Sequence, residues 1–275
     1  MSATGRPERE YRSAQHEGSP VSPPARPPLL EVSNLSKAFG GVAAVDGVSF
    51  AVAPGEIVAL IGPNGAGKST CFNLINGQLA PDAGSVRLAG RAIAGSPPRA
   101  IARLGVGRTF QVAATFASMT VRENVQLALL AHANLQQRID RRASAAFAAE
   151  ADALLERVRM TRFADQGCAT LAYGDAKRVE LALALANAPR LLLMDEPTAG
   201  MSPNSRNRMM QLAADLARQS EVAVLFTEHD MDVVFGHADR IIVLDRGRII
   251  AEGSPEAIRN EPRVRAVYLG EDEPS

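Results

Sequence analysis

The sequence predicts an α/β fold built on a largely parallel β-sheet, with a small β-rich part before it and a helical insertion within it. Short apolar runs, such as 57–61, 191–194 and 222–226, alternate with segments of helical spacing. Unbroken apolar runs of this length are typical of parallel strands that are buried on both faces. From about 98 to 171 the pattern becomes helical, which indicates an insertion into the α/β core.

The first part of the chain is expected to form the β-rich part. Residues 29–32, 48–52 and 86–88 are apolar runs with strand character, and Pro54-Gly55 and 81–84 provide turns between them. Together they predict a small β-subdomain fused to the core.

The insertion begins with a strong helix signal. Thr120 and Glu123 have the spacing of a capping box, in which each side chain bonds the backbone N–H of the other residue. A second amphipathic helix is predicted over 140–158. Its expected buried stripe consists of Phe147, Ala151, Leu154, Leu155 and Val158.

After the insertion, the alternation of helices and strands resumes. A helix near 175–187 precedes the strand at 191–194, and Ser202-Pro203 is expected to cap the next helix through the serine side chain. The remaining expected elements are strands at 222–226, 241–244 and 248–251 and a short helix that starts at Ser254-Pro255-Glu256.

The amino-acid composition limits the classes of protein to which this chain can belong. Hydrophobic residues make up 46% of the 275, and 30 Lys and Arg balance 30 Asp and Glu, so no electrostatic signature of nucleic-acid binding exists. Cys71 and Cys168 lack metal-type spacing and are expected to be buried, reduced thiols, which suits the cytoplasm. No run approaches the roughly 18 apolar residues of a membrane span, so any membrane role is expected to come through a partner chain.

The two ends of the chain are expected to be unstructured. Residues 1–28 are rich in Pro, Arg, Glu and Ser and lack the apolar core of a secretory signal, so they are expected to be a disordered extension. Residues 271–275 are expected to be a flexible tail.

A glycine-rich loop lies between a predicted strand at 57–61 and a predicted helix at 69–76. It fits G-x-x-x-x-G-K-[ST], in which backbone N–H groups and the helix N-terminus face phosphate oxygens. Lys68 is expected to reach the β- and γ-phosphates, and the Ser69 hydroxyl to bind magnesium. The chain is therefore predicted to bind a nucleoside triphosphate through Gly62, Pro63, Asn64, Gly65, Ala66, Gly67, Lys68, Ser69 and Thr70.

Two carboxylates follow the apolar strand at 191–194. The carboxyl ends of parallel strands face the ligand crevice of an α/β sheet. Asp195 is therefore expected to hold magnesium, directly or through water, and Glu196 to polarise the water that attacks the γ-phosphate.

The segment Leu171-Ala172-Tyr173-Gly174-Asp175 resembles the signature of ABC ATP-binding subunits, and the resemblance extends from about 29 to 270. It implies a P-loop NTPase of ABC type, whose RecA-like core carries an N-terminal β-subdomain and an α-helical subdomain at about 98–187. The order of motifs agrees with that family. The resemblance is strongest to the ATP-binding subunits of branched-chain amino-acid importers, through Phe39-Gly40-Gly41, Arg108-Thr109-Phe110-Gln111 and Val267-Tyr268-Leu269-Gly270.

The resemblance also implies roles for single residues. Phe39 matches the aromatic residue that stacks on adenine, Gln111 matches the glutamine that contacts magnesium and the attacking water, and His229 matches the histidine that holds the γ-phosphate. The signature residues Ala172, Tyr173, Gly174 and Asp175 are implied to face the ATP of a second subunit. Ala172, Tyr173 and Asp175 depart from the usual Leu-Ser-Gly-Gly-Gln, and Ser202 stands where aspartate is usual.

The implied function is ATP hydrolysis, with ATP and Mg²⁺, that drives an importer of branched-chain or related amino acids. The implied partners are multi-span permease subunits, a second ABC ATPase that is a copy or a homologue, and indirectly a solute-binding protein. The chain would then lie at the cytoplasmic face of the membrane. Phe116, within 112–119, is expected to line the groove that receives a permease helix.

Two alternatives stay open at this point. An exporter of lipid or polysaccharide has closely similar motifs. A soluble ABC ATPase of translation or DNA repair is disfavoured by the single P-loop, the neutral charge and the lack of sustained heptads. The sequence does not identify the solute.

Overall fold

The computed structural model describes residues 27–109, 115–133 and 147–269 of the chain, with side chains up to 266. The predicted disordered extension lies outside the described residues except for its last two positions, and so does the predicted tail. Gln111 also lies outside them, as do the side chains of 267–270, which contributed to the resemblance.

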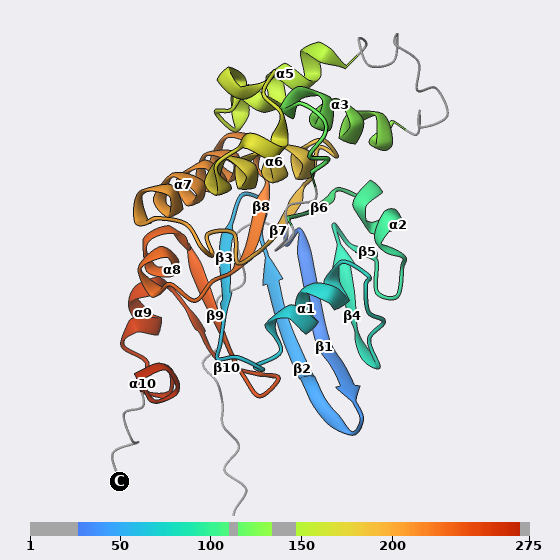
Figure 1. Cartoon of the computed structure of the whole chain (residues 1–275). Coiled ribbons are helices and arrows are strands. Elements are labelled where there is room, and N and C mark those ends of the chain that lie inside the picture. Colours follow the sequence, from blue (N-terminus) through green and yellow to red (C-terminus); the bar gives the residue numbers. More distant parts are fainter. Residues whose placement is uncertain (1–26, 110–114, 134–146, 270–275) are drawn as a thin grey trace, which may run out of the picture.

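A six-stranded sheet forms the centre of the molecule (Figure 1). Its order is β10-β9-β3-β8-β7-β6; the neighbouring strands are parallel except for β10, which pairs antiparallel with β9. The strands are β3 (Ile57–Ile61), β6 (Val106–Thr109), β7 (Leu191–Asp195), β8 (Ala223–Thr227), β9 (Arg240–Asp245) and β10 (Arg248–Gly253). The predicted, largely parallel sheet is confirmed.

Strand β6 corrects the prediction that the chain is helical from about 98 to 171. Residues 106–109 instead pair with β7 at the edge of the sheet, and Val106 and Thr109 are buried there. Four residues are too few to establish a period of two, so the pairing partner decides their conformation.

The β-rich part is a four-stranded antiparallel sheet of order β2-β1-β4-β5. It consists of β1 (Leu30–Phe39), β2 (Val42–Val52), β4 (Ala83–Leu88) and β5 (Arg91–Ala92). Strands β1 and β2 extend well beyond the predicted 29–32 and 48–52, because their outer halves are polar or exposed and are held by pairing with each other.

Two of the described helices, Met231–His237 and Pro262–Leu269, are not among the expected ones, and positions 140–146 of the helix predicted over 140–158 lie outside the described residues. Helices α3, α5 and α6 lie together beyond one end of the six-stranded sheet (Figure 1). The described helices are α1 (Lys68–Ile75), α2 (Pro98–Arg103), α3 (Val121–His132), α5 (Ala148–Arg157), α6 (Tyr173–Leu185), α7 (Pro203–Ser220), α8 (Met231–His237), α9 (Pro255–Arg259) and α10 (Pro262–Leu269), with short 3₁₀ turns at Thr161–Phe163 and Cys168–Thr170.

Two of the predicted helix starts are confirmed, and one is wrong in detail. Both bonds of the capping box at Thr120 are present, and the Ser254 hydroxyl accepts a bond from a backbone N–H at the start of α9. Ser202 occupies the N-cap position of α7, but its hydroxyl contacts the Ser205 hydroxyl at 3.1 Å instead of a backbone N–H. In α5, the predicted stripe is buried except for Phe147, which is half-buried at the N-cap position.

The six-stranded sheet is covered on both faces. Ile57, Ala59 and Ile61 pack on the side of α3, α5, α6 and α7, whereas Val58 and Leu60 pack on the side of α1 and the antiparallel sheet. Because alternate residues of one strand enter two different cores, the strand needs apolar side chains at every position. This arrangement explains the unbroken apolar runs of the sequence.

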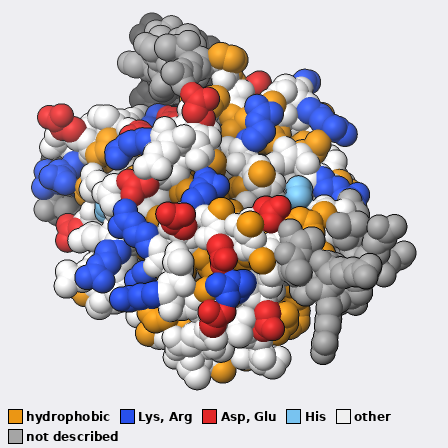
Figure 2. Space-filling model, turned by 90° about the horizontal axis from the view of Figure 1, so that it is seen from above, with side chains coloured by type: hydrophobic (Ala, Val, Ile, Leu, Met, Phe, Trp, Pro, Cys, Tyr) orange, Lys and Arg blue, Asp and Glu red, His pale blue; other side chains and the backbone are white. Residues whose placement is uncertain are grey.

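The surface matches the balanced composition. Side chains of both charge signs are interspersed over the face shown in Figure 2. Within the described ranges, no helix is long and apolar enough to cross a membrane.

Candidate functional site

The topology of the sheet brings three strand ends together. Strands β3, β8 and β7 are neighbours and run parallel, so their carboxyl ends lie at one edge of the sheet. The glycine-rich loop follows β3, Glu196 is the first residue after β7, and His229 is the second residue after β8. Segments that are more than 100 residues apart in the chain therefore meet at one place.

The glycine-rich loop is enclosed by backbone on two sides. A Cβ atom at Gly67 would lie 2.3 Å from the Ala44 carbonyl oxygen, and one at Gly62 would lie 2.3 Å from the Leu244 carbonyl oxygen. Both glycines also have positive φ angles, 104° and 157°. Since only glycine fits such contacts, β2 and β9 hold the loop in a single shape from outside.

Lys68 is the first residue of α1, and its side chain folds back onto the glycine-rich loop. Its Nζ atom donates hydrogen bonds to the Gly62 carbonyl at 2.6 Å and the Pro63 carbonyl at 3.1 Å. Burial lowers the pKa of the Lys68 ammonium, while the carboxylates of Glu196 and Asp195 act in the opposite direction. A positive side chain at the N-terminus of α1, where the helix dipole favours anions, is suited to bind phosphate.

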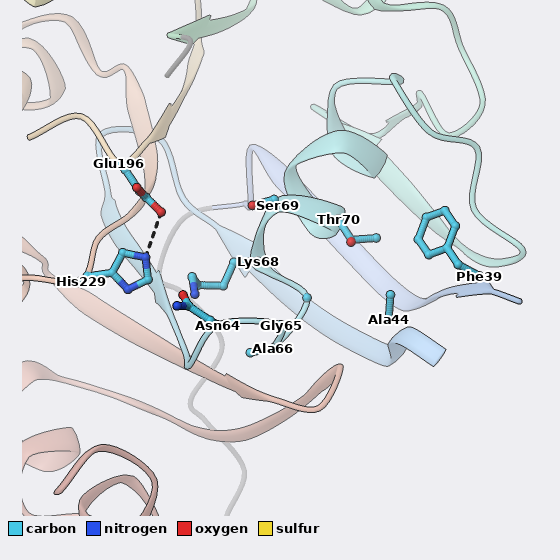
Figure 3. A pocket seen from close by; sticks show the side chains of 11 residues that line it. Phe39, Ala44, Asn64, Gly65, Ala66, Lys68, Ser69, Thr70, Glu196 and His229 are labelled. Atoms are coloured by element: carbon cyan, nitrogen blue, oxygen red, sulfur yellow. Dashed lines mark hydrogen bonds and ion pairs between the residues drawn. The ribbon is translucent and has the colours of Figure 1, made fainter. Parts of the chain in front are cut away.

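Beside the loop is a pocket of about 330 Å³ that gathers most of the predicted residues (Figure 3). Phe39, at the end of β1, is 48% exposed and lines one side. The pocket is lined by Phe39, Ala44, Asn64, Gly65, Ala66, Gly67, Lys68, Ser69, Thr70, Glu196 and His229. Ala44 was not predicted, because a small apolar residue in a strand carries no functional signal.

Glu196 and His229 face one another in this pocket. His229 Nε2 lies 2.9 Å from Glu196 Oε1, at hydrogen-bond distance (Figure 3). Glu196 has a left-handed φ of 48°, and its N–H donates to both the carbonyl and the hydroxyl oxygen of Thr227. A left-handed conformation costs a non-glycine residue on the order of 1–3 kcal/mol and is concentrated at functional sites. The arrangement can orient a water molecule and accept its proton.

Asp195, the last residue of β7, is buried and is held by two neighbours. Its Oδ1 atom accepts a bond from the Thr227 hydroxyl at 2.8 Å, and its Oδ2 atom lies 3.3 Å from Arg108. Arg108 also donates to Asn73 at 2.8 Å and to Gln78 at 3.2 Å, and burial lowers the pKa of its guanidinium. The roles of Arg108 and Thr227 were missed, because nothing local in the sequence indicates that either residue contacts Asp195.

The Ser69 hydroxyl is an oxygen ligand of the kind that magnesium uses when it is bound together with phosphate. Magnesium prefers oxygen ligands and is usually held by one or two protein groups, waters and substrate phosphates. Ser69 lines the pocket, whereas Asp195, next to Glu196 in the chain, does not line it and contacts Thr227 and Arg108. Within the described part of the chain, no cluster of three or more His, Cys, Asp or Glu offers a closed metal cage.

The predicted signature residues are placed apart from this pocket. Ala172 is the N-cap of α6, and Tyr173 is 51% exposed with its ring against Gly200. Gly174 follows in the first turn, and Asp175 pairs with Arg178 at 3.1 Å. These four residues do not line the pocket.

The chain matches known protein families and known relatives. A model of the ABC transporter family matches residues 45–199, and one of the branched-chain amino acid ATP-binding cassette transporter matches residues 248–274. The high-affinity branched-chain amino acid transport ATP-binding protein BraF of Pseudomonas aeruginosa is 42% identical over 251 residues, which cover 89% of this chain and 98% of BraF. LivG of Escherichia coli, of the same description, is 41% identical with the same coverage.

Solved structures show the same fold. The ADP conformation of MJ1267, an ATP-binding cassette of an ABC transporter, has a TM-score of 0.78 at 30% identity and covers 90% of this chain and 100% of that chain. The dimeric structure of MJ0796, a bacterial ABC transporter cassette, has a TM-score of 0.69 at 26% identity, with 82% and 98% covered. The fold is thus the ABC ATP-binding cassette, and the chain belongs to the ABC transporter ATP-binding proteins of the branched-chain amino-acid transport family that includes BraF and LivG.

Proposed function

We propose that this ABC ATPase energises the import of branched-chain or related amino acids from the cytoplasmic face of a membrane, through permease subunits. The single observation that supports ATP hydrolysis is the pocket in which the glycine-rich loop, Lys68, Glu196 and His229 come together. The amino-acid part is supported by the two relatives, which are described as branched-chain amino acid transport proteins.

The pocket suggests how ATP is held. The exposed ring of Phe39 stacks on the adenine, because a π-face suits any base. The N–H groups of the loop and the Lys68 ammonium bind the phosphates. A magnesium ion held by Ser69 and Asp195 would neutralise charge on the β- and γ-phosphates.

Hydrolysis then depends on Glu196 and His229. The oxygen of a water molecule attacks the γ-phosphorus, the bond to the β,γ-bridging oxygen breaks, and ADP and phosphate form. Glu196 orients the water and accepts its proton. His229, at 2.9 Å from Glu196, holds the carboxylate and contacts the γ-phosphate. Lys68 neutralises the charge that develops on the phosphate oxygens.

The substitution Glu196→Gln tests this assignment. Glutamine keeps the shape of the side chain but does not accept the proton, so phosphate release is expected to fall roughly 10²- to 10⁴-fold while a fluorescent ATP analogue still binds. The matched control is Glu150→Gln, an exposed position in the first turn of α5. Hydrolysis by Glu196→Gln at the rate of the control variant would contradict the proposed role of Glu196.

Phe116 supports contact with a permease helix. Its backbone is fixed by Asn124: the Phe116 N–H donates to Asn124 Oδ1 at 2.7 Å, and its carbonyl accepts from Asn124 Nδ2 at 3.1 Å. The ring nevertheless is 57% exposed. An exposed aromatic side chain on a backbone that hydrogen bonds hold in place is suited to anchor a partner. The other residues of the predicted segment up to 114 lie outside the described residues.

A charge at this position tests the proposed contact. Phe116→Glu is expected to lower amino-acid uptake by proteoliposomes of the complete transporter at least about tenfold, because a charge would be buried at the interface. ATP hydrolysis by the isolated chain should be unchanged, and Phe116→Leu should retain uptake. Normal uptake by Phe116→Glu would argue against the contact.

We also propose a second ATPase subunit, a copy or a homologue. Ala172, Tyr173, Gly174 and Asp175 do not line the pocket of their own chain, and this placement supports a contact with the ATP of another subunit. One related cassette was solved as a dimer. A solute-binding protein would complete the transporter indirectly, through the permease.

A further inference from the structure

Two turns carry the proposed catalytic pair. Glu196 begins the turn after β7, which runs through Thr198 to Gly200, and Glu228 precedes His229 in the turn after β8. The strands are in register at their ends, where Asp195 pairs with Thr227. The two turns therefore leave the sheet side by side.

Glu228 joins these turns through a buried carboxylate. Its side chain is 4% exposed. Oε1 accepts hydrogen bonds from the Thr198 N–H at 2.8 Å and from the Thr198 hydroxyl at 2.7 Å, and Oε2 accepts from the His229 N–H at 3.2 Å. A carboxylate is costly to bury unless it is hydrogen-bonded. The three donors offset this cost and hold the Glu228 side chain in one position.

The contacts form a closed ring. Glu228 connects Thr198 to the backbone of His229 on the inner side, and the His229 ring contacts the Glu196 carboxylate at 2.9 Å on the pocket side. The His229 side chain is 46% exposed, so little packing restrains its ring. Its place relative to Glu196 therefore depends on where the two backbones are held.

We propose that Glu228 is a positioning residue for ATP hydrolysis, which sets the distance between His229 and Glu196 by bonding the backbone of His229 to Thr198. This inference rests on the proposed roles of Glu196 and His229. Glu228 does not line the ATP pocket, so it acts through His229 and not on the nucleotide.

The substitution Glu228→Gln tests whether the hydrogen bonds from Glu228 to Thr198 and His229 are needed for hydrolysis. Glutamine has one acceptor oxygen, so its amide group must face either the Thr198 donors or the His229 N–H, and at least one bond is lost. The expected result is a fall in kcat of about 10- to 100-fold, as for residues that orient a reacting group, with ATP affinity within about threefold.

Thr198 provides a matched pair of variants. Thr198→Ser retains the hydroxyl donor to Glu228 and should keep kcat within about twofold of the unchanged chain, whereas Thr198→Val removes only that donor and should lower kcat about tenfold. This pair decides the question even if Glu228→Gln does not fold. Equal kcat values for the serine and valine variants would overturn the proposal.

A double-mutant cycle with His229→Ala separates positioning from stability. If Glu228 acts through His229, Glu228→Gln should change kcat less than about twofold once the imidazole is absent. A purely structural effect would lower the folded fraction, measured as ATP-binding stoichiometry, by the same factor in both backgrounds. Equal losses of kcat in both backgrounds would contradict the proposal.

Glu196→Gln, measured beside these variants on the full chain, distinguishes two failures. If it hydrolyses ATP normally, the proposed function fails. If it is inactive while Glu228→Gln has normal kcat, only the positioning role of Glu228 is overturned.

Discussion

Buried charged side chains define the site at the scale of single residues. Lys68, Asp195 and Glu228 are each buried, and each is bound to groups from another part of the chain or to the loop itself. Removing one partner would leave an unpaired buried charge, which costs more than the bond itself contributes. These residues therefore hold the strand ends in one arrangement.

Cys71 is predicted to be unreactive, although it lies in the helix that follows the phosphate loop. It is fully buried, and burial raises the pKa of its thiol to about 12. At pH 8 roughly one thiol in 10⁴ is then ionised, against about a quarter for a free cysteine. Alkylation by iodoacetamide should be at least about 100-fold slower in the folded chain than in urea, as measured by mass spectrometry.

Cys168 provides the internal comparison. It is also buried, its pKa is raised by burial, and its Sγ atom accepts a bond from Asn124 Nδ2 at 3.2 Å. Both thiols should therefore remain unmodified, with ATP hydrolysis retained after treatment. Rapid labelling of Cys71 in the native chain would contradict its burial.

Helix α3 shows how a local signal and a tertiary role combine at the scale of one element. Its capping box satisfies two backbone N–H groups, since the Thr120 hydroxyl accepts from the Glu123 N–H at 3.2 Å and the Glu123 carboxylate accepts from the Thr120 N–H at 2.7 Å. One turn later Asn124 holds the backbone of Phe116. The start of α3 thus also sets the position of the proposed anchor for a permease.

Thr120→Ala should therefore destabilise the chain by about 1 kcal/mol, as loss of an N-cap does elsewhere. The free energy of unfolding in urea measures the change, and Thr120→Ser, which keeps the hydroxyl, is the control. An alanine variant as stable as the serine variant would show that the cap contributes nothing.

The same element gives a pH prediction. The Thr120 N–H holds the pKa of the Glu123 carboxyl below its ordinary value of 4.5. A lowered pKa in the folded state means that the contribution is fully present above pH 4.5 and is lost as pH falls through the folded value. The difference in stability between the unchanged chain and Glu123→Ala should therefore shrink below pH 4.5 in urea titrations.

At the scale of the whole molecule, the separation of the signature residues from the pocket predicts a site shared by two subunits. A Cβ atom at Gly174 would lie 3.7 Å from Ser205, an ordinary contact, so alanine fits this chain. In a helix alanine is, if anything, more stabilising than glycine. A loss of ATP-dependent assembly caused by Gly174→Ala would then arise at the proposed contact with a second subunit.

Light scattering with ATP, in the Glu196→Gln background, measures that loss. Gly174→Ala should abolish ATP-dependent dimers without lowering the free energy of unfolding, because the added methyl group would meet the partner's γ-phosphate. Gly236→Ala, at an exposed helical position with open space around it, is the matched control. Dimers formed by Gly174→Ala as readily as by the control would refute the shared site.

The sequence by itself determined the features that depend on near neighbours in the chain. The phosphate loop between strand and helix, the apolar strand before Asp195, the capping box and the buried stripe of α5 apart from Phe147 could all be predicted. Each signal depends on residues within a few positions of one another, where hydrogen bonds and helical or strand periodicity act directly.

Only the tertiary structure decided which distant residues meet. Arg108 and Asp195 are 87 positions apart, and Thr198 and Glu228 are 30 apart, yet each pair lies within hydrogen-bond distance. Strand β6 likewise depends on β7, and the outer half of β1 on β2. The physical reason is that these contacts follow from the order and register of the strands, and a single buried arginine, glutamate or four-residue strand carries no local pattern that specifies its partner.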